Sequence, residues 1–124
     1  MDHRTYLTDN SARQVVQIEM VALDDYFKPG QRVDLIKMDV QGYELHVLRG
    51  ADRVLADNPT ANLLLELWPY GLKQAGTNWI ELIDALARKN MTISEVTKHG
   101  LVPVRSCLIT EDADFYVNLF ASQR

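Results

Sequence analysis

Cysteine is almost absent from this chain of 124 residues, which contains only Cys107. One thiol cannot form an internal disulfide, so a disulfide-stabilised secreted scaffold is excluded and a reduced, cytoplasmic setting is expected. No group of cysteine and histidine residues has zinc-ligand spacing, and we predict no metal site. Cys107 itself could be a nucleophile, but an ordinary strand or loop residue is the favoured interpretation.

Basic runs and long apolar runs are also missing. The formal net charge is -4, and no lysine- or arginine-rich stretch could follow a phosphate backbone, so nucleic acid is not an expected partner. No apolar stretch approaches the roughly 18 residues that cross a bilayer, so no membrane partner is expected. Residues 1–14 are polar, lack the apolar centre of a signal peptide, and are expected to form a loop or a frayed end.

Several catalytic motifs do not occur either. The sequence has no glycine-rich phosphate loop, no G-x-S-x-G and no H-E-x-x-H. What is present is an ordinary globular composition, with 47% hydrophobic and 24% charged residues. Together with the length, this composition predicts one small domain covering residues 1–124.

Apolar periodicity predicts alternating strands and helices. Strands are predicted at residues 15–21, 33–40, 61–68, 91–97 and 115–121, with a short extended piece at 101–104. Helices are predicted at residues 23–27, 43–57 and from Asn78 to Asn90, the last with a capping box formed by Asn78 and Glu81. Pro69 and Gly71 indicate a loop that runs to about Thr77.

The order of these elements favours an open, three-layer α/β fold. Strand–helix–strand units with short connections predict a mostly parallel sheet, and the last two strands, joined without a helix, predict an antiparallel end. Ligands of such sheets bind beyond the carboxyl ends of the strands. Asp39, Gln41 and Glu66 lie at these ends, so a binding cleft is expected there.

Asp39 and Glu44 are the first candidates for chemistry. Asp39 ends a buried strand, where its carboxylate could act as a general base or a ligand acceptor, or could cap the helix that begins at residue 43. Glu44 lies in the first turn of that helix, where the helix dipole alone favours a negative charge. Gly42 between them permits either a tight turn or a close approach of a ligand to the backbone.

Lys37 and Glu66 are charged residues inside apolar strands. Burying either charge alone is costly, so we expect an ion pair between them or contact with a ligand. Trp68 follows Glu66 and could form the wall of a pocket, together with Tyr70 and Trp79, although all three could equally be core residues. The histidines are scattered and are expected on the surface, and the Asp24-Asp25 pair is expected to begin a helix.

The stretch DLIKMDVQGYELHVLRGA resembles the signature of the FkbM-family methyltransferases. In that family a strand with an IK pair and an aspartate is followed by E-G-x-E and by a helix ending in L-x-G-A. The matching positions here are Ile36, Lys37, Asp39, Gly42, Glu44, Leu48, Gly50 and Ala51. The upstream VALDDYF is similar to the T-L-D segment of the family, LLLELW to its next strand, and Asp2-His3-Arg4 to a short upstream D-H-R.

This resemblance implies a class I, Rossmann-like methyltransferase sheet and S-adenosylmethionine as the cofactor. It implies the strand order 3-2-1-4-5-7-6, in which residues 33–40 and 61–68 are strands 4 and 5. The strands at 91–97 and 115–121 are then strands 6 and 7. It also implies transfer of a methyl group to a hydroxyl of a small molecule or sugar, with Asp39 and Glu44 catalytic. Asp39, Gln41 and Gly42 would bind the cofactor, and Lys37, Glu66 and Trp68 would support the substrate.

Two differences from the family qualify that expectation. Gln41 replaces the usual glutamate and removes a charge. The glycine-rich cofactor loop and the acidic residue that binds the ribose are not found, so the chain resembles the carboxyl-terminal half of the domain. The free edge of strand 33–40 is then expected to be covered by strand 15–21, by a second copy or by a partner chain. The alternatives are a non-catalytic binding or dimerisation module and, more remotely, another doubly wound enzyme whose cofactor site lies on a second chain.

Overall fold

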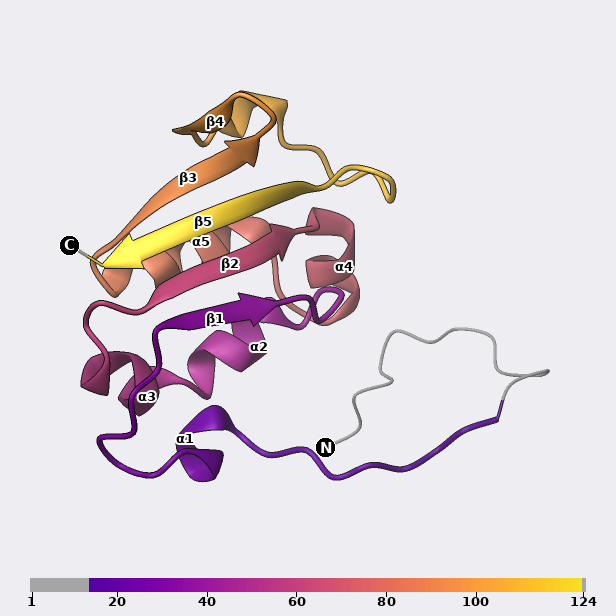
Figure 1. Cartoon of the computed structure of the whole chain (residues 1–124). Helices are drawn as coiled ribbons and strands as arrows, with labels where there is room; N and C mark the ends of the chain where they lie inside the picture. The colour runs from indigo at the N-terminus through magenta and orange to yellow at the C-terminus, as the bar shows by residue number, and fades with distance from the viewer. Residues whose placement is uncertain (1–13, 124) are drawn as a thin grey trace.

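A five-stranded sheet with helices forms the body of the computed structural model, which describes residues 14–123 (Figure 1). The strands are β1 (Leu35–Met38), β2 (Asn62–Leu67), β3 (Met91–Thr97), β4 (Gly100–Pro103) and β5 (Val117–Gln123). The helices are α1 (Leu23–Tyr26), α2 (Glu44–Arg49), α3 (Asp52–Asp57), α4 (Pro69–Gln74) and α5 (Trp79–Arg88), with a 3₁₀ turn, η1 (Ser106–Leu108). The prediction of a mixed α/β fold is confirmed.

The strands lie in the order β1-β2-β5-β3-β4. The first four positions agree with the order 4-5-7-6 that the family resemblance implies. The expectation of mostly parallel pairing is wrong, because only β1 and β2 pair in parallel. The last strand, β5, inserts between β2 and β3 and runs antiparallel to both, so β1, β2 and β3 still point the same way.

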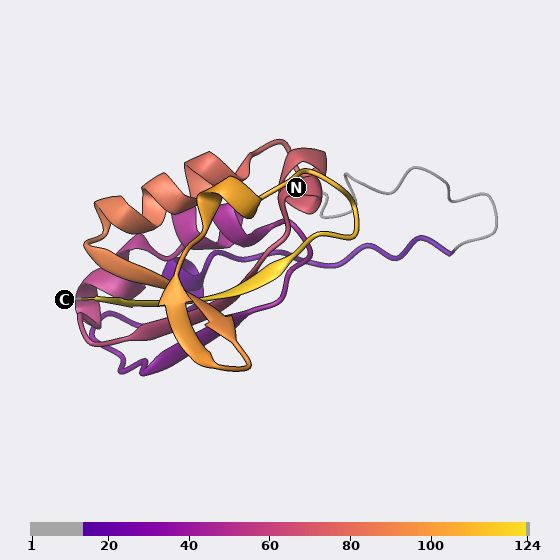
Figure 2. The ribbon, with the colours of Figure 1, turned by 90° about the horizontal axis from the view of Figure 1, so that it is seen from above.

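The expectation of three layers is also wrong for the described residues. The helices α2, α4 and α5 pack on one face of the sheet, and the opposite face carries no helix (Figure 2). The burial of β2 alternates accordingly: Leu63, Leu65 and Leu67 are fully buried under the helices, whereas Leu64 and Glu66 on the open face are only half-buried. The core is therefore one-sided, and half-buried side chains line the open face.

Three predicted elements differ from the structure. Residues 15–21 form no strand and lie exposed beside the body, because no described strand pairs with them. The predicted helix at 43–57 is divided at Gly50 and Ala51 into α2 and α3. The predicted loop after Trp68 is the helix α4, which begins at Pro69, a residue that is well suited to the first helical position.

The division between α2 and α3 has a clear physical cause. The carbonyl of Gly50 accepts a hydrogen bond from Asp24 N–H at 2.9 Å, and a Cβ at Gly50 would lie 3.1 Å from the Cβ of Ala22. The chain before β1 thus docks at the point where the helix is interrupted. The short extent of α1 agrees with the predicted helix at 23–27.

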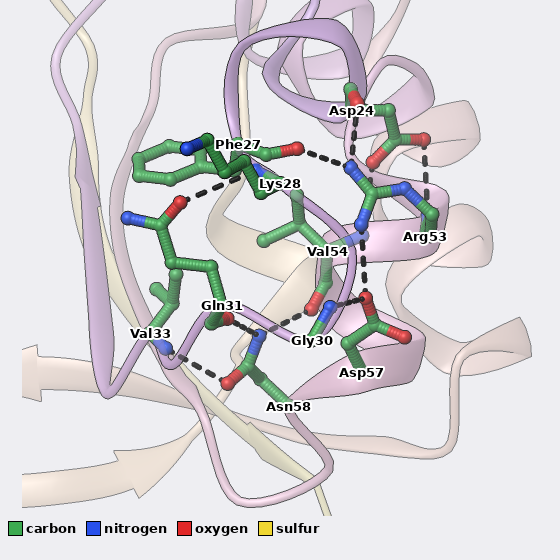
Figure 3. Close-up of polar contacts among 10 residues, drawn as sticks. All are labelled: Asp24, Phe27, Lys28, Gly30, Gln31, Val33, Arg53, Val54, Asp57 and Asn58. Atoms are coloured by element: carbon green, nitrogen blue, oxygen red, sulfur yellow. Dashed lines mark hydrogen bonds and ion pairs between the residues drawn. The ribbon is translucent and has the colours of Figure 1, made fainter.

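A polar network fastens the segment before β1 to α3 (Figure 3). Asp24 accepts hydrogen bonds from the amides of Arg53 and Val54, so it caps α3 from a distant part of the chain. The guanidinium of Arg53 donates to the carbonyls of Asp24 and Phe27 and pairs with Asp57. Desolvation alone would raise the pKa of Asp24. The pKa is lowered instead, because the hydrogen bonds from the amides of Arg53 and Val54 and the charge of Arg53 outweigh desolvation.

Asn58 completes this network below β1. It donates to the carbonyls of Val54 and Gln31 and accepts from Val33 N–H at 2.8 Å. These contacts hold the chain where it enters β1. Among residues 14–123, no helix is long and apolar enough to cross a membrane.

Candidate active site

A cleft of about 260 Å³ opens on the uncovered face of the sheet, where β1 and β2 approach their carboxyl ends. Its lining residues come from four strands: Lys37, Met38, Asp39, Leu64, Leu65, Glu66, Val96 and Asn118. Because β1 and β2 pair in parallel, both of their carboxyl ends meet at this edge. Of the three residues predicted at this edge, Asp39 and Glu66 line the cleft, whereas Gln41 is not among its lining residues.

Asp39 lies directly after β1 and is exposed to solvent. Its Oδ1 accepts a hydrogen bond from Gln41 Nε2 at 3.1 Å. Tyr43 holds the N-cap position of α2 without a side-chain capping bond, and the hydrogen bond that the structure gives Asp39 is with Gln41 and not with an amide of α2. Since capping does not account for Asp39, its carboxylate is available to a ligand in the cleft.

The turn after Asp39 needs glycine. Gly42 has φ +100°, and a Cβ there would lie 2.3 Å from the carbonyl oxygen of Gly71. Gln41 also adopts a left-handed conformation, with φ 53°. The backbone of α4 thus presses against the turn, so Gly42 serves close packing between chain segments. Binding of a cofactor by Gln41 and Gly42 remains a prediction.

Glu44 is fully buried at the start of α2, and neither of its carboxylate oxygens has a hydrogen-bond partner among the described residues. Burial raises the pKa of Glu44 to about 7, and the negative charge of Glu66 adds to the rise. The backbone groups of Glu44 itself, of Gly42 and of Val40 oppose this rise in pKa, although none bonds the carboxylate with good geometry. A buried carboxyl group without partners is rare in native proteins and commonly marks a functional site.

Glu66 stands on β2 inside the cleft and is half-buried. Its pKa is raised, first by burial and then by the negative charge of Asp39. The expected ion pair with Lys37 is wrong, since Lys37 has no salt bridge within residues 14–123. Lys37 lies opposite Leu64 and is exposed, so its ammonium group remains in water.

Trp68 does not line the cleft and instead makes structural contacts. Its indole N–H donates to the carbonyl of Ala113 at 2.7 Å, and its ring lies 5.7 Å from that of Tyr70. A Cβ at Gly71 would overlap the Trp68 ring. Trp68 therefore holds the loop before β5 against α4.

Asn118 was missed by the sequence analysis. It lies on β5 opposite Glu66 and faces the cleft. The available signal was a polar residue alternating with apolar ones in FYVNLFA, but assigning it to the cleft required knowing that β5 pairs with β2.

The described residues hold no cluster of three or more metal-binding side chains. Three carboxylates with one lysine instead make the region around the cleft acidic, which suits a cationic or hydroxyl-bearing ligand. Comparison with family models gives a match: residues 2–92 match the methyltransferase FkbM domain. The chain belongs to the FkbM methyltransferase family.

This match includes β1, the turn with Gly42, and β2, and it extends to the start of β3. It thus covers the strand ends that form the cleft, while Asn118 and Val96 lie outside it. No curated protein and no solved structure matches the chain. The predicted Asp2-His3-Arg4 resemblance lies within the matched range but outside the residues that the structure describes.

Proposed function

We propose that this FkbM-family chain forms one wall of an S-adenosylmethionine-dependent O-methyltransferase site, with the hydroxyl of a small molecule or sugar as the acceptor. The observation that carries the proposal is the cleft at the carboxyl ends of β1 and β2, lined by Asp39 and Glu66. Membership of the family supports methyl transfer, and the geometry supports the place.

The residues of the cleft fit the chemistry of the cofactor. Bound S-adenosylmethionine supplies a methyl group on a positively charged sulfur. Carboxylates of Asp39 and Glu66 complement a positive charge, and the unpartnered Glu44 adds a third acidic group beneath the strand ends. Gln41 can hold Asp39 in place through its side-chain amide.

Each carboxyl group has a separate role in this proposal. Asp39 binds the acceptor hydroxyl and takes its proton, because it is exposed in the cleft and is not used as a helix cap. Glu66, whose pKa is raised by burial and by Asp39, holds a proton more readily and supports Asp39. Glu44 does not line the cleft, and its pKa of about 7 leaves it only partly ionised near neutral pH, so it serves as a buried proton-holding group beside the strand ends.

Calorimetry with S-adenosylmethionine tests the proposal. The wild-type chain should bind it, and Asp39→Asn should weaken binding by about tenfold, equivalent to about 1.4 kcal/mol. Asp25→Asn, on the exposed surface of α1, is the matched control and should bind like wild type. Equal affinities of all three chains would refute the assignment of Asp39.

A second candidate function is a non-catalytic binding module. The uncovered face of the sheet favours it, because that face is free to contact another polypeptide. Absence of any calorimetric signal for S-adenosylmethionine would favour the binding module over the enzyme.

A further inference from the structure

The segment of residues 14–22 has the composition of a strand but no strand partner. Four of its nine residues are valine or isoleucine, and it contains neither proline nor glycine. Its apolar side chains are exposed, with Val16 at 64%, Ile18 at 59% and Val21 at 60%. In Figure 1 the segment leaves the body on the side where β1 is the edge strand of the sheet.

The strand β1, in turn, has one edge without a partner strand among the described residues. It pairs only with β2, so its outer edge presents unpaired backbone groups among the described residues. Leu35 at this edge is 55% exposed although it lies within a strand. Unpaired strands of this kind recruit additional strands.

We propose that the chain forms a homodimer in which residues 15–21 of each copy add as a strand to the free edge of β1 in the other copy. A reciprocal exchange pairs both the segment of residues 15–21 and the free edge of β1, and it gives a closed dimer with two-fold symmetry. This association goes beyond the proposed methyl transfer and does not depend on it.

Residue alternation supports this occupant. In an extended segment, Val16, Ile18 and Met20 share one face, which is wholly apolar, while Gln17 and Glu19 share the other with Val15 and Val21 at its ends. The apolar face matches the helix-covered side of β1, where Ile36 and Met38 point. The mixed face, with Gln17 and Glu19 at its centre, then lies on the open side of the sheet.

Charge supports it as well. On the open side of β1, the exposed Lys37 has no salt bridge within residues 14–123. Glu19 of the added strand would lie on that same side and could neutralise it.

The docking of the next residues favours exchange between copies. Asp24 N–H bonds the carbonyl of Gly50, and Ala22 lies against Gly50 at the end of α2. Met20 and Val21 border a groove of about 360 Å³ against Tyr43 and Val47 of the α2 region. The end of the segment is thus anchored in the helical layer, while the rest extends away from its own β1 (Figure 1).

Sedimentation velocity on the full chain tests the dimer over a roughly hundredfold range of concentration. The wild-type chain should dimerise, and Ile18→Glu should raise the dissociation constant at least about tenfold. Ile80→Glu is the matched control, because Ile80 is also an exposed isoleucine, at 63%, but lies on α5. A monomeric wild-type chain, or equal effects of the two variants, would overturn the proposal.

Charge exchange and cross-linking test the register and the partner. Lys37→Glu should weaken the dimer, and adding Glu19→Lys should restore it. In a Cys107→Ser background, Glu19→Cys with Lys37→Cys should give a covalent dimer on oxidation. A disulfide formed within one chain would show that the segment folds back on its own β1, and would refute the exchange.

Discussion

The buried polar side chains near the two ends of β1 differ in how many hydrogen bonds they make. At the amino end, the buried Asn58 makes three hydrogen bonds, to Val33, Gln31 and Val54. At the carboxyl end, the buried Glu44 makes none with either carboxylate oxygen among the described residues. Both side chains are almost inaccessible to water, so burial alone does not explain the difference.

The difference separates a structural region from a functional one. A buried group with all its partners stabilises the fold, whereas an unpartnered carboxyl group costs stability unless it serves another purpose. The carboxyl group of Glu44 lies next to the cleft residues of an FkbM-family chain. We therefore interpret its burial without partners as a loss of folding stability that serves the function of the cleft.

The largest effect is expected from Gly42→Ala, which should disrupt the carboxyl end of β1. The new Cβ would overlap the carbonyl of Gly71 and would strain a φ of +100°. We expect a loss of about 4 kcal/mol in the free energy of unfolding, measured by urea denaturation.

The control for this variant is Gly100→Ala. Gly100 has a similar φ of +106°, but a Cβ added there would meet no atom within 4 Å. It should lose only about 1–2 kcal/mol. Equal losses for the two variants would show that packing against α4 does not matter.

Glu44→Gln, unlike Gly42→Ala, should make the chain more stable than wild type at high pH. Because the pKa of Glu44 is raised to about 7 in the folded chain, the folded state retains a proton that the unfolded state has already lost. Wild-type stability should therefore fall between about pH 4.5 and about pH 8, by up to about 3 kcal/mol, and the variant should lack this part of the fall.

Urea denaturation across that pH range measures this effect. Glu111→Gln, an exposed control, should keep the wild-type pH dependence. A wild-type chain whose stability does not fall with pH would show that Glu44 is not buried as a proton-holding group.

Asn58→Ala tests the amino end of β1. It leaves Val33 N–H and two carbonyls without their partner, so we expect a loss of about 2 kcal/mol. Asn62→Ala, a half-buried asparagine on β2, should lose less than about 0.5 kcal/mol in the same thermal or urea measurement. A neutral Asn58→Ala would contradict the structural role of the network.

The smallest effect on stability is expected from Asp39→Asn. Asp39 is exposed and bonds only the side chain of Gln41 among the described residues, so the free energy of unfolding should stay within about 0.5 kcal/mol of wild type. A loss above about 2 kcal/mol would show that Asp39 is structural, in the manner of Asn58.

Periodicity predicted most of the elements, because the apolar patterns of β2, α5 and β3 are long and regular. It failed where contacts across the chain decide the structure. The helix at 43–57 divides because the distant Asp24 and Ala22 dock at Gly50. Residues 15–21 have the composition of a strand, but no described strand pairs with them.

The candidate site was predictable in part. The parallel pairing of β1 and β2 follows from the strand–helix–strand order, and it brings Asp39 and Glu66 to one edge. The exposure or burial of individual charged side chains could not be predicted from the positions of the residues in the sequence. Lys37 was expected to pair with Glu66 but is exposed, and Glu44 was attributed to the helix dipole but is fully buried.

The measurement that tests the central claim most directly is a titration of S-adenosylmethionine into the ¹⁵N-labelled chain, followed by amide chemical shifts. The account predicts dose-dependent shifts at Asp39, Gly42 and Glu66, while the amides of Val54 and Asn58 stay unchanged. Absence of shifts at the carboxyl end of β1, or shifts confined to its amino end, would contradict it.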